Sequence, residues 1–260
     1  MSAPSLDVDV LVDATPASRD RVVDLMRAVS ICVVVAWHWT FSITHWHDGR
    51  LVMPNPIADV PGLWAATWVL QVMPVFFFVG GYANLAGWQA TVREGTGAAR
   101  FVRSRLARLT RPLLPWLVCW VAFDLAAQAG GGPSVASWGR VVFVPLWFLG
   151  VFALVILAVP VTVRLHAAHR GRFLVVLGAG ILAADALRLG TDLGGPLPAV
   201  AGSGLVWLWC HQLGYFWRDG SLVAAGRARA AAVAAGGLAA LVALTVAGPY
   251  SRSMVATGGE

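Results

Sequence analysis

The stretch RVVDLMRAVSICVVVAWHW, residues 21–39, decides the fold, because it is a membrane-length apolar segment that carries ionisable side chains. In a helix, the spacing of Arg27 and His38 amounts to about 20° beyond three full turns, which puts both on one face about 16 Å apart along the axis. Asp24 and His45 fall within about 40° of the same line. Charged groups inside a membrane helix are costly and usually functional. We therefore predict a polar groove that reaches from one membrane surface to His38, near mid-span.

The composition places the whole chain in a membrane. It is 58% hydrophobic and 12% charged, with a mean hydropathy of +0.71, whereas soluble domains average about 25% charged residues. The predicted fold class is all-α: a polytopic membrane helix bundle of about seven transmembrane helices in a domain over 21–248, with a flexible tail over 1–20 and a short tail over 249–260. The predicted spans are about 22–43, 63–90, 112–128, 141–163, 172–188, 200–217 and 230–248.

Arginine placement supports this number of spans and gives an orientation. All 19 basic residues are arginine, and fourteen of them flank the spans on the side of the N-terminus, against four on the opposite side. By the positive-inside rule the N-terminus is cytoplasmic and the tail over 249–260 is extracytoplasmic. The net charge of +6 does not indicate nucleic-acid binding, because no recognition module is present. We expect a multi-pass membrane protein with a cytoplasmic N-terminus, with the lipid bilayer as its first partner.

The second span, over 63–90, is too long for a straight crossing and contains Pro74 and the pair Gly80–Gly81. Proline removes a backbone hydrogen bond and kinks a helix. Two interpretations stay open. The segment is either a packing kink with small residues at a helix crossing or a break that lines a polar cavity.

Two constellations could carry chemistry. The first is His38 with Arg27 and Asp24, because a histidine can exchange protons near neutral pH. The second is the basic stretch RFVRSRLARLTRP, residues 100–112, interpreted as a loop. Its arginines at three-residue spacing share one face and could bind phosphates bidentately, although anionic lipid headgroups would also explain a basic loop. These arginines are Arg105, Arg108 and Arg111.

Smaller signals lie elsewhere in the chain. His211 and Gln212 put polar groups late in the sixth span, and Asp185 is one turn from Arg188, with which it could pair. His47, near the outer end of the first span, belongs to a short cluster with His45 and Asp48, for which we expect no metal.

Several of these stretches resemble the acyltransferase-3 family of integral membrane O-acyltransferases, especially its actinobacterial branch. The stretch over 21–39 resembles the family's first helix, in which ten residues separate an arginine from a histidine that follows it. The basic stretch resembles the family's R-x-x-R segment. The other matching stretches are QVMPVFFFVGGYANLAGW (71–88), PLWFLGVFALV (145–155) and HQLGYFWRDG (211–220).

The resemblance implies transfer of an acetyl or other short acyl group from coenzyme A to a hydroxyl of a carbohydrate or glycolipid acceptor. It implies that acyl-CoA, most readily acetyl-CoA, is the co-substrate, without a metal. It carries the family's histidine over to His38, its first-helix arginine to Arg27 and its loop pair to Arg105 and Arg108, and it implies a bacterial cytoplasmic membrane. From the residues themselves we expect His38 to act as general base, Asp24 to hold Arg27 in place, and Arg111 to join Arg105 and Arg108 as a coenzyme A ligand. Family members usually have about ten spans, so we expect this chain to be C-terminally truncated. A proton-coupled transporter or flippase, and an inactive truncated relative, are the alternatives.

Overall fold

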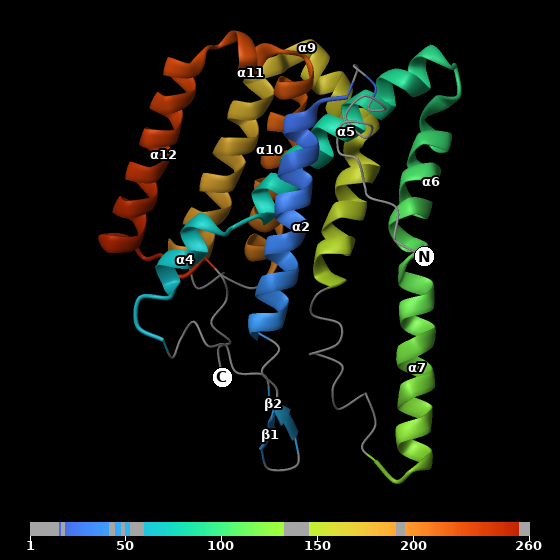
Figure 1. The fold of residues 1–260 in the computed structure, drawn as a ribbon. Helices are drawn as coiled ribbons and strands as arrows, with labels where there is room; N and C mark the ends of the chain where they lie inside the picture. The colour runs from blue at the N-terminus through green and yellow to red at the C-terminus, as the bar shows by residue number, and fades with distance from the viewer. Residues whose placement is uncertain are drawn as a thin grey trace, which may run out of the picture.

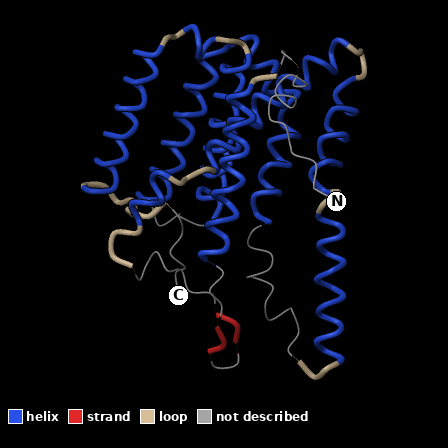
Figure 2. The backbone as a smooth tube through the Cα atoms, viewed as in Figure 1, coloured by secondary structure: helices blue, strands red, loops and turns tan. Residues whose placement is uncertain are grey.

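The structure is a computed structural model that describes residues 16, 19–41, 45–47, 50–52, 60–132, 146–190 and 196–254. Helices dominate it, and two three-residue strands form a small antiparallel hairpin below the end of α2 (Figures 1 and 2). The elements are α2 (Arg21–Phe41), β1 (His45–His47), β2 (Arg50–Val52), α4 (Trp64–Val69), α5 (Met73–Arg93), α6 (Gly97–Thr110), α7 (Leu113–Ala129), α9 (Trp147–Gly190), α10 (Pro196–Arg218), α11 (Ser221–Ala224) and α12 (Arg227–Val246).

The predicted all-α membrane bundle is confirmed. The described helices form a bundle in which α12 lies at one side and the consecutive α6 and α7 at the other (Figure 1). The spans predicted over 141–163 and 172–188 are the two limbs of α9, which reverses direction at Arg170 (φ 36°, ψ −113°). Arg170 is the single non-glycine residue with positive φ in the described ranges, a conformation that costs energy for a side chain with a Cβ.

The outer helices have the exposed apolar surfaces that lipid requires. In α7 no described residue is buried, and in α12 only Thr245 is, although both helices are rich in leucine, valine and alanine. Five helical segments of the described chain are long and apolar enough to cross a membrane. Because apolar side chains exposed on this scale are unfavourable in water, the protein is a multi-pass membrane protein.

The core of the bundle is α10, which packs mainly against α5 and α9. Glycines allow the close approach of α5 and α10. A Cβ on Gly81 would lie 1.9 Å from the carbonyl oxygen of His211, and a Cβ on Gly214 would lie 2.0 Å from the carbonyl oxygen of Phe78. Of the two interpretations of Gly80–Gly81, the structure supports small residues at a helix crossing.

The second span is broken, as one of its two interpretations predicted, but the break lies before Pro74 and not at Gly80–Gly81. α4 ends at Val69, and Pro74 is the second residue of α5, where a missing N–H costs little. Two other local expectations from the sequence are wrong. The basic stretch is the helix α6, not a loop. Because α2 ends at Phe41, His45 lies in β1 and does not extend the polar face of the helix.

The break between α4 and α5 leaves backbone groups that need new partners, and α2 supplies one of them, while side chains next to the break bind the backbone of Met254, beyond α12. Trp37 of α2 donates its indole N–H to the carbonyl oxygen of Leu70 at 3.2 Å. Gln71 donates to the carbonyl oxygen of Met254, and the hydroxyl of Thr67 accepts the Met254 N–H at 3.0 Å. A non-helical backbone is tolerated at membrane depth when protein groups satisfy it in this way.

Candidate functional site

One cavity brings together three of the arginines singled out from the sequence. It has a volume of about 310 Å³ and is lined by Arg27 of α2, Arg105 and Arg108 of α6, Asn84 of α5, and apolar side chains of α5 and α9. We call it the arginine cavity. Three guanidiniums around one small space can bind an anion, because each is a cation with several N–H donors.

Arg105 is held in place by the helix that it faces. Its Nη2 donates to the carbonyl oxygen of Ala83 at 2.9 Å, and its guanidinium lies 5.4 Å from the ring centroid of Phe101. Gly87 makes room for it, since a Cβ there would lie 1.9 Å from Nη2. A guanidinium has five N–H donors, so Arg105 keeps donors for a ligand after it has bonded to Ala83.

Asp24 lies one turn before Arg27 and pairs with it. Its carboxylate is 3.8 Å from Arg27 Nη1 and also forms an ion pair with Arg19. Asp24 thus balances part of the positive charge and orients Arg27. Arg108 lines the cavity and donates to the carbonyl oxygen of Ser104. Arg111 is exposed just after α6 and is not among the residues that line the cavity.

His38 lies apart from these arginines. It is in the last turn of α2, beyond the middle of the helix where the sequence placed it, and its side chain is exposed. α2 runs unbroken from Arg21 to Phe41, so His38 shares the face of Arg27 but lies about 16 Å farther along the axis. Its Nδ1 is 2.7 Å from the carbonyl oxygen of Val34. Because a carbonyl oxygen only accepts, this contact places the proton of a neutral ring on Nδ1 and leaves the lone pair on Nε2.

Asn84, which lines the arginine cavity, belongs to a buried polar pair with His211, which lies behind it. His211 is fully buried, and the Asn84 amide donates to its Nε2 at 3.0 Å. The His211 Nδ1 has no hydrogen-bond partner among the described residues. His211 thus fixes the orientation of Asn84 at the cavity. The sequence marks His211 as a polar residue in an apolar span, but it gives no signal for Asn84 as its partner.

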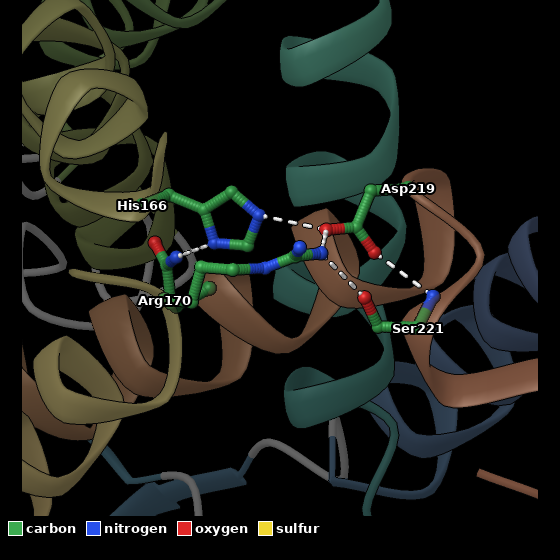
Figure 3. Close-up of polar contacts among 5 residues, drawn as sticks. His166, Arg170, Asp219 and Ser221 are labelled. Carbon is green, nitrogen blue, oxygen red and sulfur yellow. Dashed lines mark hydrogen bonds and ion pairs between the residues drawn. The ribbon is translucent and has the colours of Figure 1, made fainter. Parts of the chain in front are cut away.

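A second polar cluster ties α9 to the end of α10 (Figure 3). His166 donates from Nε2 to Asp219 Oδ2 at 3.1 Å, and the Gln212 amide donates to His166 Nδ1 at 2.6 Å. Arg170 donates to Asp219 at 2.7 Å and to the Ser221 hydroxyl at 2.8 Å. The cluster holds the α9 reversal against the turn after α10, which accounts for the strained backbone at Arg170.

The electrostatics of Asp219 follow from this cluster. Partial burial raises the pKa of Asp219, but hydrogen bonds from Ser221, His166 and Arg170 together outweigh it and leave the pKa below its ordinary value. Sequence reasoning missed this cluster, although His166 and Arg170 have the four-residue spacing of neighbours on a helix face. The predicted pair of Asp185 and Arg188 is present at 3.5 Å, and the Tyr250 hydroxyl also donates to Asp185.

Comparison with known proteins agrees with the resemblance found in the sequence. The family model of acyltransferase-3, described as an acyltransferase domain, matches residues 20–258. No curated protein and no solved structure matches the chain. The matched range includes α2, with Asp24, Arg27 and His38, and α6, with Arg105 and Arg108. The chain therefore belongs to the acyltransferase-3 family and is a multi-pass membrane acyltransferase.

Proposed function

We propose that this acyltransferase moves an acetyl or other short acyl group from coenzyme A to a hydroxyl group on a carbohydrate or glycolipid of the bacterial cell envelope. The observation that carries the proposal is the arginine cavity, where Arg27, Arg105 and Arg108 meet. Acyl-CoA is an anionic cytoplasmic thioester with a diphosphate, and guanidiniums bind phosphate oxygens through paired, charge-assisted hydrogen bonds. In this proposal Arg105 and Arg108 bind the diphosphate, and Arg27 is oriented by Asp24.

The proposed orientation puts the donor on the correct side of the membrane. At one end of the bundle, α2 begins, α5 passes into α6, and α9 reverses (Figure 1). The arginine distribution assigns this end to the cytoplasm. The arginine cavity lies next to this end, since Arg27 and Ala83 also line a cavity that is lined by Arg19 and Asp20 at the start of α2.

In the proposed mechanism His38 is the general base. The lone pair on Nε2 removes the proton of the acceptor hydroxyl while its oxygen attacks the thioester carbonyl carbon. The C–S bond then breaks, the acyl group stays on the acceptor oxygen as an ester, and His38 returns the proton to the thiolate of coenzyme A. General-base catalysis of this kind contributes about 10²–10⁴-fold in rate.

The distance between His38 and the arginines is compatible with this donor. The pantetheine arm of coenzyme A is a long chain that separates the phosphates from the thioester, so the phosphate site and the catalytic base must lie well apart. The separation of about 16 Å along α2 provides for this, and the Asp24–Arg27 pair lies toward the proposed cytoplasmic end. A transporter would need a polar path through the bundle, but the family match favours acyl transfer.

The proposal is tested by incubating membranes that contain the protein with radiolabelled acetyl-CoA and identifying the envelope molecule that becomes labelled. Arg105→Ala is expected to reduce labelling strongly, because it removes a charged ligand of the donor. Arg103→Ala is the matched control, since Arg103 is an exposed arginine of the same helix and does not line the arginine cavity. No labelled product with wild-type protein would favour the inactive alternative, and equal labelling by both variants would contradict the role of Arg105.

A further inference from the structure

Three cavities adjoin one another at the proposed cytoplasmic end. The arginine cavity shares Arg27 and Ala83 with a cavity of about 540 Å³, which we call the mouth cavity. The mouth cavity shares Arg93 with a third cavity of about 660 Å³, lined also by Trp88 and Gln89, which we call the Trp88 cavity. The three cavities are therefore neighbours that share lining residues of α2 and α5, an arrangement that suits one extended ligand.

The mouth cavity has more positive charge than its own carboxylates balance. Arg19, Arg27, Arg93 and Arg218 line it, against Asp20 and Asp24. Asp24 is paired with Arg19 and Arg27. Asp20 caps the start of α2 through the N–H groups of Val22 and Val23 and accepts the indole N–H of Trp217. Neither aspartate is thus the partner of Arg93 or Arg218.

These two arginines present donors to the cavity in different ways. Arg218 is oriented by Tyr82, whose hydroxyl accepts from Nη1 at 3.0 Å, and by Gln89, which accepts from Nε at 3.4 Å. Arg93 is in the last turn of α5 and makes no hydrogen bond or ion pair with the described residues. Each guanidinium carries five donors, so both can bind an anion, and Arg218 is preorganised for it.

We propose that the mouth cavity binds the 3′-phosphate of the donor nucleotide through Arg93 and Arg218, and that the adenine lies in the Trp88 cavity. This inference rests on the proposed function. Six arginines and two aspartates line the arginine cavity and the mouth cavity together, which leaves an excess of four positive charges. Coenzyme A carries a diphosphate and a phosphate monoester, and the charge of the monoester is about −1.5 to −2 at pH 7. The total negative charge of coenzyme A is therefore close in size to this positive excess.

The Trp88 cavity offers the surface that a purine needs. The Trp88 ring is fixed by an edge contact with Phe101, with centroids 5.4 Å apart. Leu85 and Val92 add apolar surface, and Gln89 adds an amide. Aromatic side chains bind nucleobases by stacking, and Arg93, which lines both cavities, would lie between the base and its ribose phosphate.

The first experiment compares two donors that differ only in the 3′-phosphate. The protein in phosphatidylcholine nanodiscs is assayed for KM with acetyl-CoA and with acetyl-dephospho-CoA. Wild type is expected to prefer acetyl-CoA on the order of 100-fold, the effect of one charge-assisted hydrogen bond from each of the two arginines. Arg93→Ala is expected to reduce this ratio about tenfold, because Arg218 remains. Arg100→Ala, which replaces an exposed arginine of α6 outside the three cavities, is expected to leave the ratio unchanged. An unchanged ratio in Arg93→Ala would overturn the inference.

The second experiment does not depend on catalysis. Binding of adenosine 3′,5′-bisphosphate is measured in the same nanodiscs, and Arg93→Ala and Arg218→Gln are each expected to weaken it on the order of tenfold. If binding follows this expectation but neither donor is used, the nucleotide site stands and the proposed function fails. If the variants differ from wild type only after phosphatidylglycerol is added, these arginines bind lipid headgroups, and the inference is wrong.

Discussion

Replacing Gly87 by alanine tests the position of Arg105 without removing any charge. The new Cβ would lie 1.9 Å from Arg105 Nη2 and 2.9 Å from Cζ, whereas ordinary contacts begin near 3.4 Å. The guanidinium must therefore move by more than an ångström, which breaks its 2.9 Å hydrogen bond to Ala83. A hydrogen bond of a charged group is worth about 1.5–3 kcal/mol, so transfer activity is expected to fall roughly 10- to 100-fold.

The effect on stability should be much smaller than the effect on activity. Alanine is favoured over glycine in a helix by about 1 kcal/mol, which offsets part of the lost contact, and the flexible Arg105 side chain can turn away without moving a backbone. The assays are acetyl transfer from acetyl-CoA and thermal unfolding in detergent. Gly236→Ala in α12 is the matched control, because nothing lies within 4 Å of its Cβ position. Wild-type kinetics in Gly87→Ala would refute the view that a fixed Arg105 is needed.

Two further predictions concern the frame of the site. Gly81→Ala puts a Cβ 1.9 Å from the His211 backbone oxygen, which cannot swing away, so we expect a loss of about 1–3 kcal/mol in unfolding free energy, measured by thermal unfolding against Gly236→Ala. Asp219→Asn should also destabilise the fold, by about 1–3 kcal/mol at pH 7. Because the folded pKa of Asp219 is depressed, this contribution is complete above its unfolded pKa of about 3.9 and is lost as pH falls through the lower folded pKa. The stability difference between wild type and Asp219→Asn should therefore shrink below about pH 4, and a constant difference would contradict the reasoning.

Much of the fold could be predicted from the hydropathy pattern and from the positions of the arginines. Apolar segments between basic segments predict the bundle because lipid and the positive-inside rule act on each segment separately. The same approach failed at α6, whose alternation of arginines with apolar residues was interpreted as a loop. The reversal predicted between 163 and 172 is present at Arg170, although the positive φ falls on an arginine and not on the glycine that this conformation favours.

The candidate site was predictable where it depends on spacing within one helix. Arg27 and Asp24, three residues apart, do pair, and Arg105 and Arg108 do line one cavity. Contacts between helices were not predictable, because the sequence does not show which faces meet. The Asn84–His211 pair is such a contact, and the orientation that it gives to Asn84 at the arginine cavity follows only from the packing of α5 on α10.

The central claim is that His38 removes the acceptor proton while the arginines hold the donor. The most direct test measures acetyl transfer and acetyl-CoA binding on the same purified preparations of His38→Ala and of His169→Ala, an exposed histidine outside the described cavities. His38→Ala should bind acetyl-CoA like wild type but transfer at least about 100-fold more slowly, and His169→Ala should do both normally. Full transfer by a correctly inserted His38→Ala protein would contradict the account.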